Sequence, residues 1–151
     1  MLSRTLEGRP GVLGETYLSF KHNMSYERYL DHLPRYLRRV LTKMRVSDHD
    51  LMIERGRRIR PKLPREQRLC SFCPIEIENE QHMLIDCTLY GSRHKLFEKI
   101  AGKYPNFSTL NSQQKFIFLM TQEDEQLVLE TAVSLNSWLR LRDLLMSYFL
   151  G

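Results

Sequence analysis

The sequence predicts a mainly α-helical domain that is interrupted by a short loop holding all three cysteines of the chain. Apolar residues recur at helical spacings of three and four both before and after that loop. With 151 residues, 42% of them hydrophobic, the chain can bury a core, which excludes disorder throughout. The cysteines are odd in number and crowded together, a pattern that favours metal binding in a reducing compartment over disulfides.

The N-terminal part is expected to be a leader followed by a basic helix. Residues 1–16 carry glycine and proline without apolar periodicity, which predicts a flexible leader. Ser25 is a candidate cap for a helix whose apolar stripe spans residues 26–44. Because proline lacks a backbone N–H, Pro34 is expected to bend or split this helix.

A short helix and an extended connector should follow. Ser47 and Asp50 have the spacing of a capping box, which predicts a helix through residues 51–53 that stops near Gly56. From there to residue 69 the chain is basic and punctuated by two prolines, which favours an extended connector.

The C-terminal part is expected to contain three helices. The first begins after Cys87 and ends near Gly102, where residues 104–106 form a turn, and the second covers residues 110–120. The sequence at 121–124 has the form of a second capping box and should open a last, long helix.

These elements suggest a division of the chain into four segments. They are a leader (1–16), a basic helical segment with its connector (17–68), the cysteine loop (69–88) and a C-terminal helical segment (89–151) that packs with 17–55 as one domain. No long apolar window and no signal peptide are present, so we expect no membrane segment and an intracellular location, nuclear or cytoplasmic.

The cysteine loop has the spacing C-x2-C-x8-H-x4-C, formed by Cys70, Cys73, His82 and Cys87. Three thiolates and one imidazole are typical ligands of tetrahedral Zn²⁺. Four protein ligands leave no open position for water or substrate, so the predicted zinc knuckle is structural, contributing on the order of 10 kcal/mol to folding. His94 is an alternative fourth ligand, and three packed cysteines beside a surface histidine are the alternative to a metal site.

Positive charge is concentrated before this loop. Residues 28–68 hold thirteen Lys and Arg against five Asp and Glu, a net charge of +8, whereas the rest of the chain sums to −3. Such a block is typical of a surface that meets phosphates, although a nuclear localisation signal or a solvated basic face would look the same. The candidate nucleic-acid contacts are Arg35, Arg38, Arg39, Lys43, Arg45, Arg55, Arg57, Arg58, Arg60, Lys62, Arg65 and Arg68.

Aromatic and acidic residues complete the candidate surface. Phe72 lies inside the knuckle and is the preferred candidate to stack on an unpaired base, whereas Tyr36 is expected to pack in the protein. Glu76, Glu78 and Glu80 alternate within the loop and are expected to be solvated. The sequence contains no phosphate-binding glycine loop, nucleophile elbow or paired catalytic aspartates, so we expect no enzyme.

Several segments together resemble the C-terminal tail of LINE-type (non-LTR) retrotransposon reverse transcriptases, over roughly residues 17–150. They are YLSFK at 17–21, ERYL at 27–30, LTKMR at 41–45, HDLMIERGR at 49–57, ENEQH at 78–82 followed by Cys87, and YGSR at 90–93. The resemblance implies a Cys-Cys-His-Cys zinc motif and a role in gripping template RNA or target DNA. The polymerase and endonuclease domains of that family are absent, so we expect either a fragment or a separately encoded tail.

The favoured hypothesis is therefore a zinc-stabilised module that binds RNA or DNA. If it neutralises about five phosphates of duplex DNA, log K should fall with log salt at a slope of roughly −4 to −5, and alanine at Arg57, Arg58 and Arg60 should flatten it. A second hypothesis is a zinc-shaped protein-interaction or dimerisation module, and a third is a brace for a missing polymerase domain. The second would use apolar residues of the last helix, namely Trp138, Leu141, Leu144, Met146 and Tyr148.

Overall fold

The computed structural model describes residues 29–150 and confirms the mainly helical fold class. Within these residues it has six α-helices, and an isolated antiparallel bridge between Leu69 and Ile77 takes the place of any sheet. The expected leader, the Ser25 cap and the start of the basic helix lie outside the described residues.

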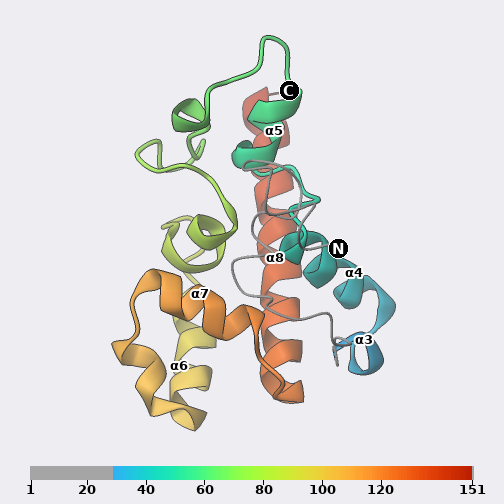
Figure 1. The fold of residues 1–151 in the computed structure, drawn as a ribbon, viewed down its shortest axis with the longest axis vertical. Helices are drawn as coiled ribbons and strands as arrows, with labels where there is room; N and C mark the ends of the chain where they lie inside the picture. The colour runs from blue at the N-terminus through green and yellow to red at the C-terminus, as the bar shows by residue number, and fades with distance from the viewer. Residues whose placement is uncertain (1–28, 151) are drawn as a thin grey trace, which may run out of the picture.

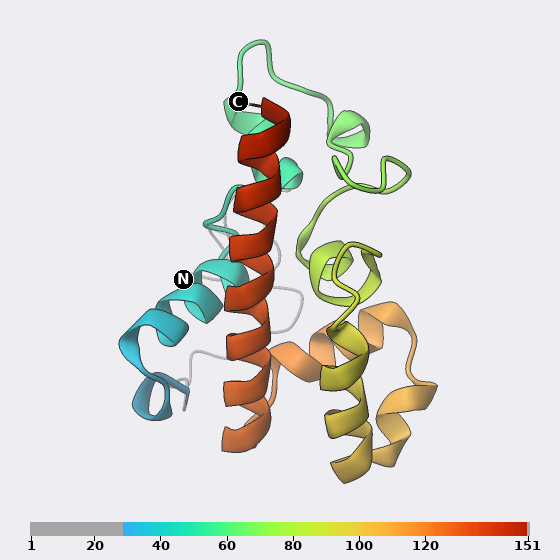
Figure 2. The ribbon, with the colours of Figure 1, turned by 180° about the vertical axis from the view of Figure 1, so that it is seen from behind.

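The longest helix, α8 (Glu125–Leu150), runs through the middle of the molecule (Figures 1 and 2). Helices α3 (Tyr29–His32) and α4 (Arg35–Arg45) lie on one side of it, while the cysteine loop, α6 (Arg93–Lys103) and α7 (Ser112–Met120) lie on the other. Apolar side chains from both sides meet those of α8 in a shared buried cluster. None of the helices in the described part of the chain is long and apolar enough to cross a membrane.

Pro34 separates α3 from α4, as the sequence predicts. It is the residue before the first turn of α4, where its missing N–H costs no helical hydrogen bond. Leu37, Leu41 and Met44 then place the apolar face of α4 in the core, because residues three and four apart share one side of a helix.

The capping box predicted at residues 47–50 is wrong. Ser47 has a positive φ of 61°, and its buried hydroxyl donates to Glu80 (2.6 Å) and does not cap a helix. Helix α5 (Met52–Arg58) begins after Leu51 without a side-chain cap and continues through Gly56. The glycine is needed there because a Cβ atom would lie 2.6 Å from Cγ of Arg68, which crosses the helix.

After α5 the connector (residues 59–64) bends back, so that the N–H of Leu63 donates to the carbonyl of Gly56 (2.9 Å), and the extended connector that the sequence predicts is wrong. It leads to a short 3₁₀ turn, η1 (Arg65–Gln67). The cysteine loop follows and ends in a single π-helical turn, η2 (His82–Asp86). Beyond α6, the turn expected at 104–106 is the start of a 3₁₀ segment, η3 (Pro105–Thr109).

Two side chains cap the C-terminal helices. Asn111 and Gln114 form a reciprocal capping box at α7, where none was predicted from the sequence. Asp124 accepts the N–H groups of Gln126 (3.0 Å) and Leu127 (3.3 Å) and so caps α8. The capping box predicted for 121–124 is therefore wrong, because Thr121 ends α7 and its hydroxyl bonds back to the carbonyl of residue 117.

Candidate metal centre and basic surface

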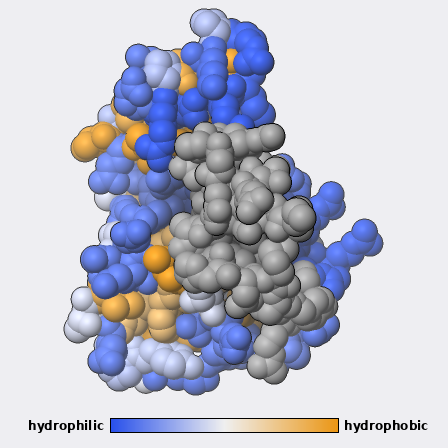
Figure 3. All heavy atoms as spheres, viewed as in Figure 1, coloured by the Kyte–Doolittle hydropathy of each residue, from blue (hydrophilic) through white to orange (hydrophobic). Residues whose placement is uncertain are grey.

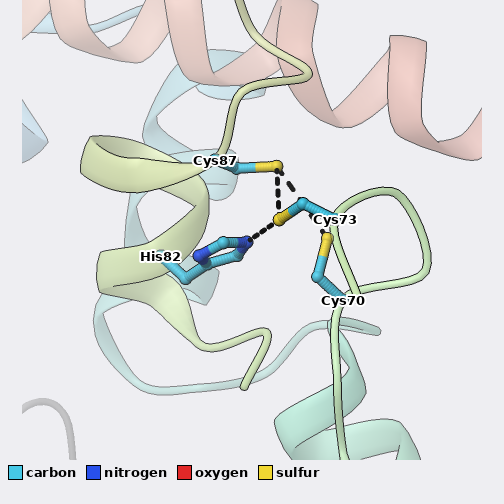
Figure 4. Close-up of side chains that lie close together, drawn as sticks. All are labelled: Cys70, Cys73, His82 and Cys87. Carbon is cyan, nitrogen blue, oxygen red and sulfur yellow. Dashed lines mark hydrogen bonds between the residues drawn. The ribbon is translucent and has the colours of Figure 1, made fainter. Parts of the chain in front are cut away.

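The cysteine loop brings Cys70, Cys73, His82 and Cys87 to one point (Figure 4). Cys70 and Cys73 lie in a tight turn that the Cys70 N–H closes by donating to the carbonyl of Glu76 (2.9 Å). His82 comes from η2, and Cys87 directly follows that turn, so a single helical turn presents both of these side chains toward the first two.

Two distances between sulfur atoms fit a tetrahedral ion. The Sγ atom of Cys87 lies 3.8 Å from that of Cys70 and 3.9 Å from that of Cys73. A tetrahedron with Zn–S bonds of about 2.3 Å has sulfur atoms about 3.8 Å apart. Nε2 of His82 lies 3.0 Å from the Cys73 sulfur, and the donor atoms of all four residues lie within 4.8 Å of one another. The donor set and its spacing therefore suit a metal ion such as zinc.

Glu76 orients the histidine of the cluster. Its carboxylate lies 3.0 Å from Nδ1 of His82, so Nδ1 carries the proton and Nε2 is left to face the cysteines. Partners of this kind hold metal-binding histidines in the right tautomer and orientation. His94 is exposed and engages the carbonyl of Gly91 (2.6 Å), so it does not belong to the cluster.

Burial and mutual contact separate the pKa values of the thiols. Burial raises the pKa of Cys70, but hydrogen bonds with His82 and the Phe72 backbone outweigh it and bring the pKa down to about 7. Burial raises the pKa of Cys87 to about 12. A divalent cation favours the thiolate form of every ligand, so metal binding at this cluster would release protons.

A buried arginine supports the backbone of the loop. Arg93, at the start of α6, donates to the carbonyls of Met83 (2.6 Å), Leu84 (2.7 Å) and Cys87 (2.6 Å). These carbonyls lie where η2 ends and would otherwise lack partners. The role of Arg93 was not predicted from the sequence, because its partners are backbone carbonyls and no distinctive residue pattern surrounds it.

Two of the three glutamates expected to be solvated are buried. Glu78 and Glu80 retain only 1% and 3% of their surface exposed, and of the three only Glu76 is exposed. Glu78 forms a two-pronged ion pair with Arg142 of α8 (2.7 and 2.8 Å), and Glu80 binds Ser47 and His49. Alternation along the loop places these two carboxylates inward, where they tie it to α8 and to the turn before α5.

Two predicted nucleic-acid contacts are buried and do not belong to an exposed surface. Arg45 is 5% exposed and donates to the carbonyl of Met120 on α7. Arg68, also 5% exposed, donates to the carbonyls of Ile53 (2.9 Å) and Leu63 (3.0 Å) and thereby fixes the connector against α5. Both guanidinium groups therefore bind backbone carbonyls inside the protein.

Three further candidates lie beside acidic partners. Arg57 binds Glu54 through two nitrogens, and Arg58 binds Asp50 (2.7 Å). Arg55 lies 3.8 Å from the same aspartate. These pairs reduce the net positive field of α5, so the arginine run on this helix is less available to phosphates than its sequence suggests.

The remaining cations form two groups, all exposed except the half-buried Arg38. The basic face of α4 consists of Arg35, Arg38, Arg39 and Lys43, and the connector group consists of Arg60, Lys62 and Arg65. Hydrophilic side chains project from the edge of the molecule where Figure 1 places α4, as Figure 3 shows. Helix α8 separates this face from the metal cluster (Figure 1).

The apolar and aromatic candidates differ in how far they are buried. Phe72 is half-buried and packs against the core, whereas Tyr36 is 59% exposed. On the last helix Trp138 and Met146 are buried. Leu141, Leu144 and Tyr148 remain exposed, by 38%, 60% and 83%.

Comparisons of this chain with protein-family models, with curated proteins and with solved structures found no match.

Proposed function

We propose that this chain is a zinc-stabilised helical module that binds nucleic acid through exposed arginine and lysine side chains. The observation that carries the proposal is the basic face of α4, where four cations gather with no acidic residue between positions 32 and 47. Arginine and lysine make the sequence-independent phosphate contacts that supply most nonspecific nucleic-acid affinity.

In this proposal the zinc ion has a structural role. Cys70, Cys73, His82 and Cys87 would hold it with four protein donors, which fills a tetrahedral coordination sphere. The ion supplies cross-linking between the cysteine turn and η2 and no catalytic step. The sequence resemblance to the C-terminal tail of LINE-type reverse transcriptases also supports a structural zinc ion in a nucleic-acid-binding module. We assign no polymerase activity to the chain.

The test compares two charge-matched triple variants of the zinc-loaded protein. One is Arg35→Gln, Arg39→Gln and Lys43→Gln on α4, and the other is Lys95→Gln, Lys99→Gln and Arg140→Gln, at exposed positions elsewhere. Binding of labelled RNA and DNA is measured by fluorescence anisotropy over a salt series. The α4 variant should bind at least about tenfold more weakly, with a salt slope shallower by roughly 2 to 3.

The control triple should change the affinity by less than about threefold, because its cations lie outside the proposed surface. Equal losses in both variants would mean that only net charge matters. No binding by the wild-type protein at low salt would refute the proposed function.

A second candidate function is self-association of this chain through α8. Leu144 and Tyr148 are exposed near its C-terminal end, and Leu141 lies one turn before Leu144. Exposed apolar side chains at helical spacing are typical of helix-mediated association. Sedimentation of the wild-type protein and of Leu144→Glu distinguishes this candidate, because self-association should be lost in the variant.

A further inference from the structure

The basic face of α4 carries an exposed aromatic ring. Tyr36 keeps 59% of its surface accessible, although its helix buries Leu37, Leu41 and Met44 within the core. A tyrosine that only filled space would gain more by turning toward that core, since a buried aromatic ring removes a large apolar area from water. Tyr36 instead presents an accessible ring on the outer side of the helix.

Helical geometry places cations directly beside this ring. Arg39 lies three positions after Tyr36 and Lys43 seven positions after it, so the three side chains follow one edge of α4. With a rise of 1.5 Å per residue, Arg39 is about 4.5 Å and Lys43 about 10 Å further along the helix axis.

The same cations enclose space for a ligand. Arg35, Arg38, Arg39, Thr42 and Lys43 line an open surface hollow of about 460 Å³. Among the residues that the structure describes, the lining offers guanidinium, ammonium and hydroxyl donors without a carboxylate, which is the composition expected of a phosphate contact.

We infer that Tyr36 is a stacking platform for an unpaired base, and that the preferred ligand of the α4 face is single-stranded nucleic acid, RNA or DNA. A base on the Tyr36 ring would place its backbone along the hollow, where Arg39 and Lys43 meet successive phosphates. Stacking platforms flanked by cations are the usual basis of sequence-tolerant single-strand binding, whereas bases in a duplex are already stacked on each other. This inference rests on the proposed function and specifies its ligand.

The experiment measures binding of the zinc-loaded protein to three labelled probes at one salt concentration. They are an oligouridylate of about twelve nucleotides, the oligodeoxythymidylate of the same length, and a duplex of similar charge. Tyr36→Ala should weaken binding to both single strands by roughly five- to hundredfold and change duplex binding by less than about twofold. Tyr36→Phe keeps the ring and should retain single-strand binding.

The matched control is Tyr148→Ala. Tyr148 is even more exposed, but the residues one turn earlier on α8 are Leu144 and Leu145, so its own helix does not place a cation one turn before the ring. This control should leave all three affinities unchanged. As a second readout, crosslinking to an oligonucleotide that contains 5-iodouridine should map to Tyr36 and spare Phe72.

Two outcomes would overturn the inference, and they are distinguishable from failure of the proposed function. If Tyr36→Ala binds single strands as tightly as wild type, or loses duplex binding equally, Tyr36 is no stacking platform while nucleic-acid binding itself stands. If the wild-type protein binds none of the three probes, the proposed function fails and the inference fails with it.

Discussion

At the scale of single residues, the charges around the cysteine loop are organised as buried contacts. Glu78 accepts two bonds from Arg142 and one from the N–H of Met52 (2.7 Å), so one carboxylate joins the loop, α8 and α5. Both side chains of the ion pair are only 2% exposed. Breaking such a pair leaves a buried charge without compensation, which costs far more than the loss of a surface ion pair.

Replacing Arg142 with Met should therefore lower the free energy of unfolding by about 3–5 kcal/mol. Urea unfolding in excess zinc, followed through the fluorescence of Trp138, measures this loss. Arg140→Met on the exposed side of the same helix is the control and should change stability by less than about 0.5 kcal/mol. A loss below about 1 kcal/mol for Arg142→Met would mean that Glu78 is not left as an unpaired buried charge, which would contradict the contact with Arg142.

The contact between Glu76 and His82 leads to a prediction about metal affinity. Glu76→Ala removes the acceptor that orients the imidazole and should weaken zinc binding by about tenfold, since this carboxylate is partly solvated. Competition with a colorimetric chelator measures the affinity. Glu66→Ala, at an exposed glutamate of η1, serves as control; identical affinities for the two variants would assign Glu76 no role at the site.

Residue patterns in the sequence predict the metal ligands better than they predict the fate of charged side chains. The spacing of three cysteines and one histidine is a local pattern, so it identifies the cluster directly. The burial of Arg45 and Arg142 depends on a carbonyl and a carboxylate that lie far away in the chain, and that of Arg68 on the carbonyls of Ile53 and Leu63. No local sequence pattern contains those partners. A count of Lys and Arg in the sequence therefore overestimates the number of cations at the surface.

At the scale of helices, apolar periodicity identifies each α-helix of the C-terminal part, but capping motifs are less reliable. Ser47 and Thr121 both match the capping-box spacing, yet tertiary contacts and the end of α7 determine their conformations. The side chains that do cap, Asn111 and Asp124, have the same chemistry as many loop residues. The residue at which a helix ends depends on tertiary packing, so a short stretch of sequence does not determine it.

Asp124 connects helix capping with pH. Its carboxylate caps α8, and the Lys103 ammonium beside it holds the pKa of Asp124 below its usual value. Asp124→Ala should lower the melting temperature near pH 7 by about 2–4 °C. Glu123→Ala, at the exposed neighbour, should leave it unchanged.

The pH dependence of this effect follows from the lowered pKa. The folded state binds the proton less tightly than the unfolded state, so the contribution of Asp124 is complete above its usual pKa and is lost as pH falls through the folded value. Melting curves of wild type and Asp124→Ala should therefore converge below roughly pH 4. A constant difference between pH 7 and pH 3 would contradict the assignment.

At the scale of the whole molecule, α8 lies between two regions of different chemistry. One side carries the metal cluster, whose loop is fixed by Glu78 to Arg142, and the other side carries α4 and its cations (Figure 1). The sequence predicts the helical class and the inserted cysteine loop because both depend on local spacing. It does not predict that α8 lies between the cluster and the basic face, because that arrangement arises from packing between distant segments.

We propose that one tetrahedral ion, held by Cys70, Cys73, His82 and Cys87, organises this fold. The most direct test is the metal content of the purified protein, measured by mass spectrometry together with circular dichroism. We expect one zinc ion per chain, which His94→Ala retains and Cys87→Ser loses together with part of its helical signal. A wild-type protein that is fully folded without metal, or a Cys87→Ser variant that keeps a full equivalent of zinc, would contradict it.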